Sequence, residues 1–176
     1  TATIFVNPTQ FNNPTDLQKY PRTLDSDISK LENAGCDALF LPDENEMYGE
    51  SETWEYNLGG IADDLEGAHR PGHFKGVSQV VYKLFKCIPA DMAFFGQKDF
   101  QQCLVIKKLV ADFNLPIHLH FCPIIREKDG LALSSRNIHL NEEERTNALI
   151  LSETLNFVKR RAFFYFDPPY KPVSQT

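Results

Sequence analysis

Residues 92–122, MAFFGQKDFQQCLVIKKLVADFNLPIHLHFC, decide the fold. Their pattern predicts an apolar strand at Met92–Phe95, a tight turn at Gly96–Asp99, a helix at Asp99–Asn114 and a strand at Pro116–Cys122. A strand, a helix and a strand in this order form two parallel strands joined by a right-handed crossover. The alternation therefore predicts an α/β fold.

The segments before this stretch repeat the alternation. A strand is expected at Thr1–Val6, a helix from Thr23 to Gly35 and a strand at Asp37–Leu41, with the long loop Asn7–Arg22 after the first strand. A further helix is indicated by an apolar stripe formed by Val77, Val80, Val81, Leu84, Phe85 and Ile88. We expect a mostly parallel sheet with helices on its faces.

Two helix starts have the spacing of a capping box, in which two side chains three residues apart bond to each other's backbone N–H. Asp99 and Gln102 begin one helix. Asn141 and Glu144 begin the other, which is expected to run to about Arg161. Its apolar positions are Ala148, Leu151, Leu155 and Val158.

Composition fits a globular domain, since 42% of the 176 residues are apolar and 24% are charged. The formal charge of −6 argues against a general nucleic-acid or anionic membrane surface. The sequence has no apolar stretch long enough for a membrane span and no signal peptide, so the cytoplasm is the expected location.

The first residues already have a strand-like sequence, with no turn or cap before them, so the chain looks truncated at its start. No metal site is indicated, and the cysteines are expected to be reduced core residues, namely Cys36, Cys87, Cys103 and Cys122.

Ligands of parallel sheets bind outside the carboxyl ends of the strands, which selects the loops Asn7–Gln10, Gly96–Asp99 and Gly130–Asn137. The first offers amides for a polar substrate, although Asn-Pro also forms turns. The second places Lys98 at a helix N-terminus, where an anion is favoured, or is a simple exposed turn. The third offers two hydroxyls and a guanidinium suited to phosphate oxygens, or is a polar turn.

A basic loop, Glu66–Lys75, contains His69 and His73. Metal binding is not expected there, because the proline and glycine between the histidines break the helix that would align them. His118 and His120 alternate on a strand and are expected to face solvent or to lie at an edge.

Five blocks follow one another along the chain: IFVNPTQF at 4–11, DLQKYPRTL at 16–24, LEGAHRPGHF at 65–74, FGQKDFQQ at 95–102 and REKDGLALSSRN at 126–137. Together they resemble the pantothenate synthetase family, which implies a three-layer, Rossmann-like nucleotidyl transferase fold. In that family ATP activates pantoate to a pantoyl adenylate with release of pyrophosphate. The amine of β-alanine then displaces AMP.

The resemblance implies roles for residues that bind the two smaller substrates. Gln10 and Gln102 would hold pantoate. Asn7 and Tyr20 would border the adenylate and the incoming amine.

For the nucleotide, the resemblance implies that Asp99 and the Gly96 backbone meet the ATP ribose. Catalytic residues would surround the phosphates, where fixed cations stabilise the charge that accumulates at the α-phosphorus: Lys98, Ser134, Ser135 and Arg136. The Ser-Ser-Arg run would correspond to the mobile KMSKS loop of related nucleotidyl transferases. Mg²⁺ would bridge the phosphates of ATP mostly through water. A cytoplasmic homodimer without membrane or nucleic-acid partners is implied as well.

The resemblance divides the chain into three parts. Residues 1–123 would be a partial Rossmann-like domain that binds nucleotide and pantoate, 124–161 the start of a C-terminal domain that closes over ATP, and 162–176 an unrelated tail. The family's first strand and its His-x-Gly-His motif normally precede the opening segment and are not in the sequence, so a truncated chain is expected. Gln97 stands where the family usually has glutamate.

The tail is different. Residues 163–174, FFYFDPPYKPVS, resemble the Asp-Pro-Pro-Tyr segment of DNA adenine methyltransferases, in which Asp167, Pro168 and Tyr170 would contact a flipped adenine. A composite chain joined between Arg161 and Phe163 is one explanation. A C-terminal strand with an aromatic stripe is the other.

The sequence therefore predicts an AMP-forming ligase of carbon–nitrogen bonds that condenses pantoate with β-alanine, with the activity of this truncated chain left open. One alternative is a fragment of a DNA adenine methyltransferase. The other is a fragment that binds nucleotide or pantoate without turnover.

Overall fold

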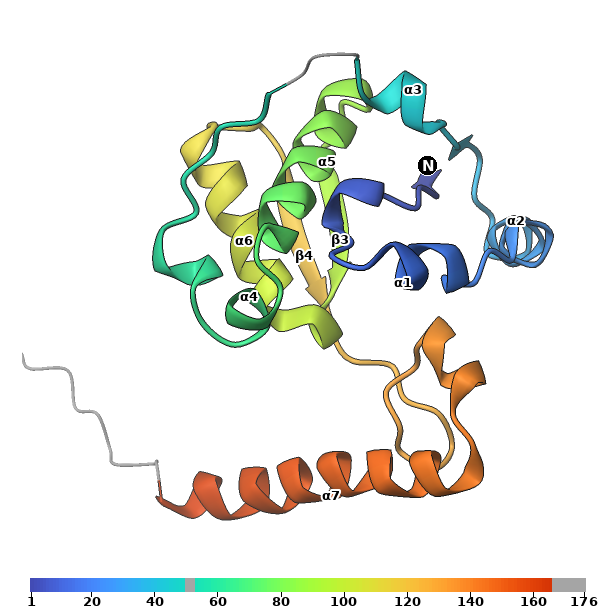
Figure 1. Cartoon of the computed structure of the whole chain (residues 1–176), viewed down its shortest axis with the longest axis vertical. Coiled ribbons are helices and arrows are strands. Elements are labelled where there is room, and N and C mark those ends of the chain that lie inside the picture. Colours follow the sequence, from blue (N-terminus) through green and yellow to red (C-terminus); the bar gives the residue numbers. More distant parts are fainter. Residues whose placement is uncertain (50–52, 166–176) are drawn as a thin grey trace, which may run out of the picture. The chain divides into compact units, whose positions relative to one another are not determined.

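The structure is a computed structural model that describes residues 1–49 and 53–165. The chain separates into two compact units, Thr1–Pro123 and a second unit that begins at Ile124. The boundary falls directly after the strand β4, His118–Cys122 (Figure 1).

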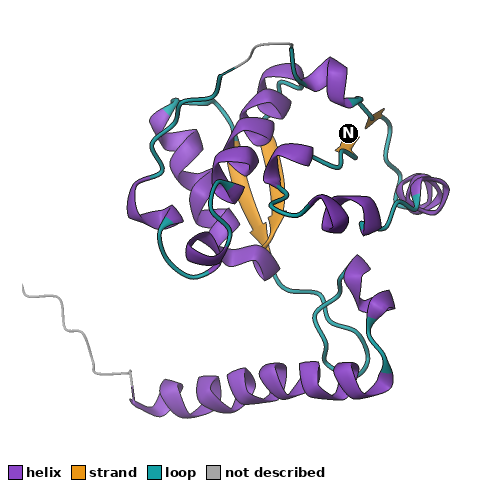
Figure 2. Ribbon diagram, viewed as in Figure 1, coloured by secondary structure: helices purple, strands orange, loops and turns teal. Residues whose placement is uncertain are grey.

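Among the residues described, the first unit holds two parallel sheets of two strands each. In one, β1 (Ala2–Thr3) pairs with β2 (Leu39–Phe40). In the other, β3 (Met92–Gly96) pairs with β4, as the two adjacent arrows in Figure 2 show. Met92 lies opposite His118. The parallel pairing predicted for β3 and β4 is confirmed, and the expected sheet is present as two separate pairs.

Helices connect these strands. The helix predicted from the apolar stripe is α5, and the helix predicted after the tight turn is α6. The α-helices of the first unit are α1 (Pro14–Lys19), α2 (Leu24–Asn33), α3 (Glu44–Met47), α4 (Glu66–His69), α5 (His73–Cys87) and α6 (Phe100–Asp112). Its 3₁₀ turns are η1 (Pro8–Gln10), η2 (Gly59–Ala62) and η3 (Gln97–Asp99).

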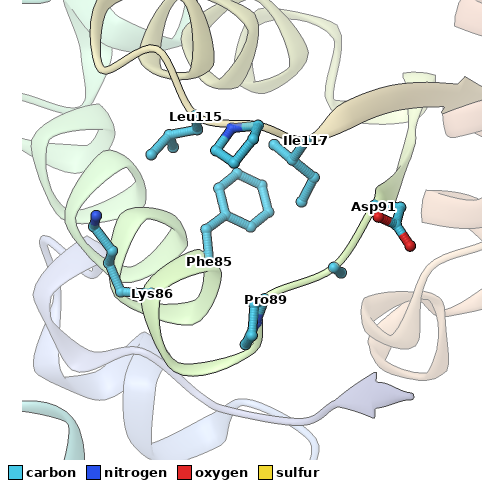
Figure 3. Close-up of a pocket in the computed structure, with 8 residues that line it drawn as sticks. Phe85, Lys86, Pro89, Asp91, Leu115 and Ile117 are labelled. Carbon is cyan, nitrogen blue, oxygen red and sulfur yellow. The ribbon is translucent and has the colours of Figure 1, made fainter.

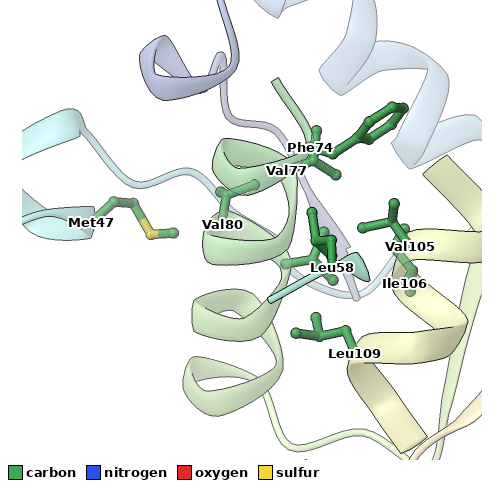
Figure 4. Packing of buried hydrophobic residues seen from close by; sticks show 9 residues of the cluster. Met47, Leu58, Phe74, Val77, Val80, Val105, Ile106 and Leu109 are labelled. Carbon is green, nitrogen blue, oxygen red and sulfur yellow. The ribbon is translucent and has the colours of Figure 1, made fainter. Parts of the chain in front are cut away.

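The core lies where α5 packs against α6 (Figure 4). Phe74 and Val77 on α5 are buried together with Val105, Ile106 and Leu109 on α6. Each such side chain stabilises the fold by about 1.5–3 kcal/mol when fully buried. Residues in or close after the strands of both sheets pack against this cluster, among them Phe5, Phe40, Phe95 and Leu119. One helix pair therefore supports both sheets.

The chain's one tryptophan lies in the extended segment before η2. Trp54 Nε1 donates to Ser78 Oγ at 3.0 Å, and its ring stacks on Phe113 with centroids 5.8 Å apart. Tyr56 Oη donates to Asp112 Oδ2 at 2.9 Å, and burial together with this hydrogen bond raises the pKa of the Tyr56 phenol. These contacts fix the segment across α5 and the end of α6.

The capping box predicted for Asp99 and Gln102 is wrong. The Asp99 side chain makes no cap hydrogen bond, and its backbone, with ψ of 66°, lies outside the extended region usual for an N-cap; its carboxylate pairs with Lys98 Nζ at 3.0 Å. Thr23 makes no side-chain cap bond to α2 either, and its backbone, with ψ of 47°, lies outside the extended region usual for an N-cap.

The cysteines are unpaired, as predicted. The expectation that they are core residues is right only in part, because Cys103 is buried whereas Cys87 is exposed. His118 and His120 are exposed on one face of β4, as predicted.

In the second unit, a looped segment leads through η4 (Ser135–His139) into the long helix α7 (Glu142–Tyr165). Asn141 and Glu144 exchange the predicted capping bonds, each at 2.9 Å. The sequence pattern therefore located the start of α7 correctly.

The helix α7 is longer than predicted, because it continues past Arg161 to Tyr165. The alternative of a C-terminal strand that starts at Phe163 is therefore wrong for residues 163–165, which are helical. Leu151 and Leu155, expected to pack, are 70% and 65% exposed. No helix in the described part of the chain is long and apolar enough to span a membrane. The residues of the methyltransferase-like motif lie outside the described residues, namely Asp167, Pro168 and Tyr170.

Candidate active site

The first part of the site is the turn η1, which is held by Asn7. This residue is buried, and its Oδ1 accepts from Thr9 N, Thr9 Oγ1 and Tyr48 Oη at 3.3, 3.0 and 2.6 Å. Its Nδ2 donates to Gly76 O at 3.2 Å and to Gln10 Oε1 at 3.3 Å. Both ends of the Asn7 amide are therefore hydrogen-bonded within the protein. The bond from Nδ2 to Oε1 orients the Gln10 side chain.

The backbone carbonyl of Gln10 is held from the other side by Arg70 and His73. Arg70 Nη2 donates to it at 3.1 Å, and His73 Nδ1 lies 2.8 Å away. Because a carbonyl only accepts, Nδ1 carries the proton of the His73 ring. Burial lowers the pKa of His73, and the charge of Arg70 acts in the same direction. A neutral histidine therefore holds Gln10.

The backbone of η1 lies in close contact with the backbone at the start of α5. A Cβ at Gly76 would lie 2.5 Å from Thr9 O, so only glycine fits there without a shift. Asn12 Nδ2 also donates to Pro71 O at 2.6 Å. The first turn of α5 and the loop before it therefore form a rigid cradle for η1.

The second part of the site is the turn between β3 and α6. Lys98 and Asp99 are exposed and paired with each other. The negative charge of Asp99 acts to raise the pKa of His73, against the larger effect of burial. Burial raises the pKa of the Cys103 thiol, and Asp99 acts in the same direction.

Two neighbouring glutamines on α6, Gln101 and Gln102, differ in burial and in their contacts. Gln102, named from the sequence, is half-buried. Gln101 is buried, donates to Ile61 O at 2.7 Å and Asp64 O at 2.8 Å, and accepts from Glu66 N at 3.0 Å. Sequence reasoning missed Gln101, because nothing in the pair Gln-Gln shows which side chain turns inward. Gln101 holds the segment between η2 and α4.

Tyr20 lies at the C-terminal end of α1, and its ring packs edge-on against Phe11 with centroids 5.7 Å apart. This contact joins α1 to the residue that follows η1.

The phosphate-binding residues expected from the sequence are divided between the units. Ser134 Oγ accepts from Arg136 N at 3.3 Å and caps η4, and Ser135 and Arg136 are exposed. These three belong to the second unit, whereas Lys98 belongs to the first. Their convergence on one triphosphate stays a prediction.

A pocket of about 450 Å³ lies at the amino ends of β3 and β4, whereas η3 follows the carboxyl end of β3 (Figure 3). None of the expected site residues lines it. Its lining includes Phe85, Lys86, Pro89, Asp91, Leu115 and Ile117.

Metal-binding groups are not gathered in the part of the chain that the structure describes, where no three His, Cys, Asp or Glu side chains could hold an ion together. His73 is committed to Gln10, and Asp99 is paired with Lys98. The donor set therefore does not fit a protein cage for Mg²⁺.

The family model described as pantoate-beta-alanine ligase matches residues 1–171. The chain belongs to this family. Pantothenate synthetase of Porphyromonas gingivalis is 53% identical over 154 residues, which cover 88% of this chain and 55% of the relative. The enzyme of Bacteroides fragilis is 50% identical over 162 residues, covering 92% and 57%. The chain spans about half the length of these relatives.

Solved structures of the family share the fold. Pantothenate synthetase from Thermus thermophilus superposes with a TM-score of 0.82 at 45% identity, over 86% of this chain and 55% of that one. The ligase of Francisella tularensis, complexed with beta-gamma ATP and beta-alanine, gives 0.82 at 42% identity, over 88% and 59%. This likeness confirms the predicted α/β, Rossmann-like nucleotidyl transferase fold.

Proposed function

We propose that this chain carries the pantoate-binding and part of the ATP-binding machinery of a ligase that condenses pantoate with β-alanine. The observation that carries the proposal is the fixed position of Gln10, which Asn7, Arg70 and His73 hold after β1. Family membership supports the chemistry, as does the relative complexed with beta-gamma ATP and beta-alanine.

Gln10 and Gln102 are proposed to bind pantoate, because an amide both donates to and accepts from hydroxyl and carboxylate oxygens. The bond from Asn7 Nδ2 to Gln10 Oε1 leaves the Gln10 Nε2 donors for the ligand. A side chain fixed in advance loses less freedom on binding, which raises affinity. Asn7 thus acts by positioning Gln10, and Tyr20 borders the adenylate and the amine.

Lys98 is proposed to stabilise the negative charge that develops when a pantoate oxygen attacks the α-phosphorus of ATP. That step forms the new P–O bond and releases pyrophosphate. Attack of the β-alanine amine on the acyl carbon then forms the amide bond and releases AMP. Asp99 and the Gly96 backbone are assigned to the ribose, and the phosphates to Lys98, Ser134, Ser135 and Arg136.

Mg²⁺ is proposed to accompany ATP and to neutralise part of the phosphate charge. The described side chains do not form a cage for it, so phosphate oxygens and water are its ligands in this proposal. A cytoplasmic homodimer also belongs to the proposal, and sedimentation equilibrium tests the dimer.

Binding and turnover are tested separately, because the chain spans about half of its relatives' length. Thermal stabilisation by pantoate and by MgATP measures binding, and pyrophosphate release measures turnover. Stabilisation without pyrophosphate indicates a binding fragment. Tight binding of S-adenosylmethionine would instead favour the methyltransferase alternative.

The division of roles is tested by Gln10→Ala and Gln102→Ala, with the exposed Gln18→Ala as the matched control. We expect the first two variants to weaken pantoate binding about tenfold or more and to leave MgATP binding nearly unchanged. Equal loss of both ligands rejects the assignment of these glutamines to pantoate.

A further inference from the structure

The loop that carries Ser135 and Arg136 is tied to α7 by Arg145. Its Nε donates to Asp129 Oδ2 at 2.7 Å, and its Nη2 donates to Glu127 Oε2 at 2.6 Å. A guanidinium presents these donors in a fixed planar fork, which suits two carboxylates at once. Arg145 therefore fixes the loop in position and orientation.

The second oxygen of Glu127 carries this tie on to η4. Asn137 Nδ2 donates to Glu127 Oε1 at 2.5 Å and to Ala132 O at 3.0 Å. Asn137 directly follows Arg136 and donates its backbone N–H to Ser134 O at 3.1 Å. A continuous chain of contacts thus runs from Arg145 through Glu127 and Asn137 to the Ser-Ser-Arg turn.

Residues 125–133 of this loop are also joined by backbone hydrogen bonds. Glu127 N donates to Leu131 O at 2.7 Å, and Leu133 N donates to Ile125 O at 2.9 Å. Gly130 makes the reversal between them with φ of +94°, a conformation that favours glycine. A second tie to α7 comes from Ser152, whose hydroxyl donates to Gly130 O at 3.1 Å.

The three charged groups of this network each have a pKa shifted toward the charged form. The hydrogen bond from Asn137 and the ion pair with Arg145 lower the pKa of Glu127. The Leu131 N–H and Arg145 lower the pKa of Asp129. The two carboxylates raise the pKa of Arg145. All three groups are therefore charged at neutral pH, and the tie is closed there.

We infer that Arg145 is a positioning residue for the nucleotide phosphates, because it fixes η4 through Glu127 and Asn137 before ATP binds. The inference rests on the proposed function. A loop that is already ordered loses less conformational freedom on binding. The gain then lies in affinity for the phosphates, and pantoate binding does not share it. The Ser-Ser-Arg turn and the start of α7 form one braced body.

The first measurement follows the loop itself. Arg145→Gln removes the tie, Arg145→Lys keeps the charge without the fork, and Lys128→Gln removes a charge from the same loop outside these contacts. Hydrogen exchange of the Glu127, Leu131 and Leu133 amides should become about tenfold faster in Arg145→Gln and less so in Arg145→Lys. It should not change in Lys128→Gln. Unchanged exchange in Arg145→Gln overturns the inference whatever the function.

The second measurement follows the ligands, by calorimetry with MgATP, with inorganic pyrophosphate and with pantoate. Arg145→Gln and Asn137→Ala should each weaken the two phosphate ligands about tenfold and leave pantoate unchanged. The double variant should add little, because both changes break one chain of contacts. A loosened loop with unchanged MgATP affinity overturns the positioning role. Failure of the unmodified chain to bind MgATP overturns the proposed function and the ligand part of the inference, and exchange still decides the structural part.

Discussion

The two segments that carry the expected site residues are held in opposite ways. The turn η1 is held by buried, largely neutral hydrogen bonds and by close backbone contact at Gly76. The loop of the second unit is held by ion pairs whose side chains are 27–32% exposed. Buried contacts of the first kind respond to shape, and exposed ion pairs respond to pH and salt. The proposed pantoate region is thus built on steric fit and the proposed phosphate region on charge.

The largest effect is expected where steric fit is tightest. Gly76→Ala places a Cβ 2.5 Å from Thr9 O, and we expect a loss of about 1–3 kcal/mol in the free energy of unfolding, as for other overpacked sites. Urea denaturation measures it. Gly60→Ala is the control, because a Cβ there meets nothing within 4 Å. Similar stability of both variants would show that the cradle yields easily.

A smaller effect is expected from a substitution that removes a hydrogen bond to Gln10 and keeps a side chain of similar size. His73→Leu removes the 2.8 Å donor of the Gln10 carbonyl, to which Arg70 still donates, so we expect a loss of about 0.5–1.5 kcal/mol together with weaker pantoate binding. His69→Leu changes the exposed histidine at the end of α4 and should have little effect. If both variants bind pantoate as the unchanged chain does, His73 has no part in positioning Gln10.

A change of pH should separate the two regions. The folded pKa of His73 lies below its ordinary value of 6.5, so its neutral form contributes stability above that pH, and the contribution is lost as pH falls toward the folded pKa. Arg70, Glu66 and Asp99 are the charged groups that act on it.

Glu127 and Asp129 also have lowered pKa values, but from 4.5 and 3.8. Their stabilisation is complete above those values and is lost only as pH falls through the lower folded ones. NMR spectra recorded from about pH 7.5 to about pH 3 should therefore show η1 changing first and the loop of the second unit later. Loss of both regions in one pH window would contradict the comparison.

The smallest effect is that of salt. Raising ionic strength from about 0.05 to 1 M shortens the screening length several-fold and should speed hydrogen exchange in the loop of the second unit. Exchange in α5 should not change, because its contacts to η1 are buried. Equal acceleration in both places would mean that salt acts on the whole chain.

The local sequence pattern was sufficient to predict those helices and strands whose apolar residues recur at a regular spacing. The α5 stripe and the strand–helix–strand order of residues 92–122 were predicted correctly, since both depend on residues a few positions apart. The helix α1 was missed, because six residues are too few to show a period, although Asn13 and Pro14 form a visible N-cap signal. Asp99 was misassigned because the spacing of a capping box does not show the backbone conformation of the cap residue, which at Asp99 is not extended.

The rule for parallel sheets selected three loops, and the assignment of a site to them stays a prediction. Gly96–Asp99 directly follows β3, whereas Gly130–Asn137 lies in the second unit and follows no strand. The grip of Arg70 and His73 on Gln10 joins residues about 60 positions apart, and no local spacing signals such a contact. Arg145 was missed for the same reason, because its acidic partners lie 16 and 18 residues away.

The stacking of Trp54 on Phe113 gives the chain an internal optical reporter. It is the chain's one indole, and it lies in the unit of Gln10 and Lys98. Its emission spectrum will therefore follow the melting of that unit alone. Comparing it with circular dichroism, which sums all helices including α7, can show whether the two units melt independently.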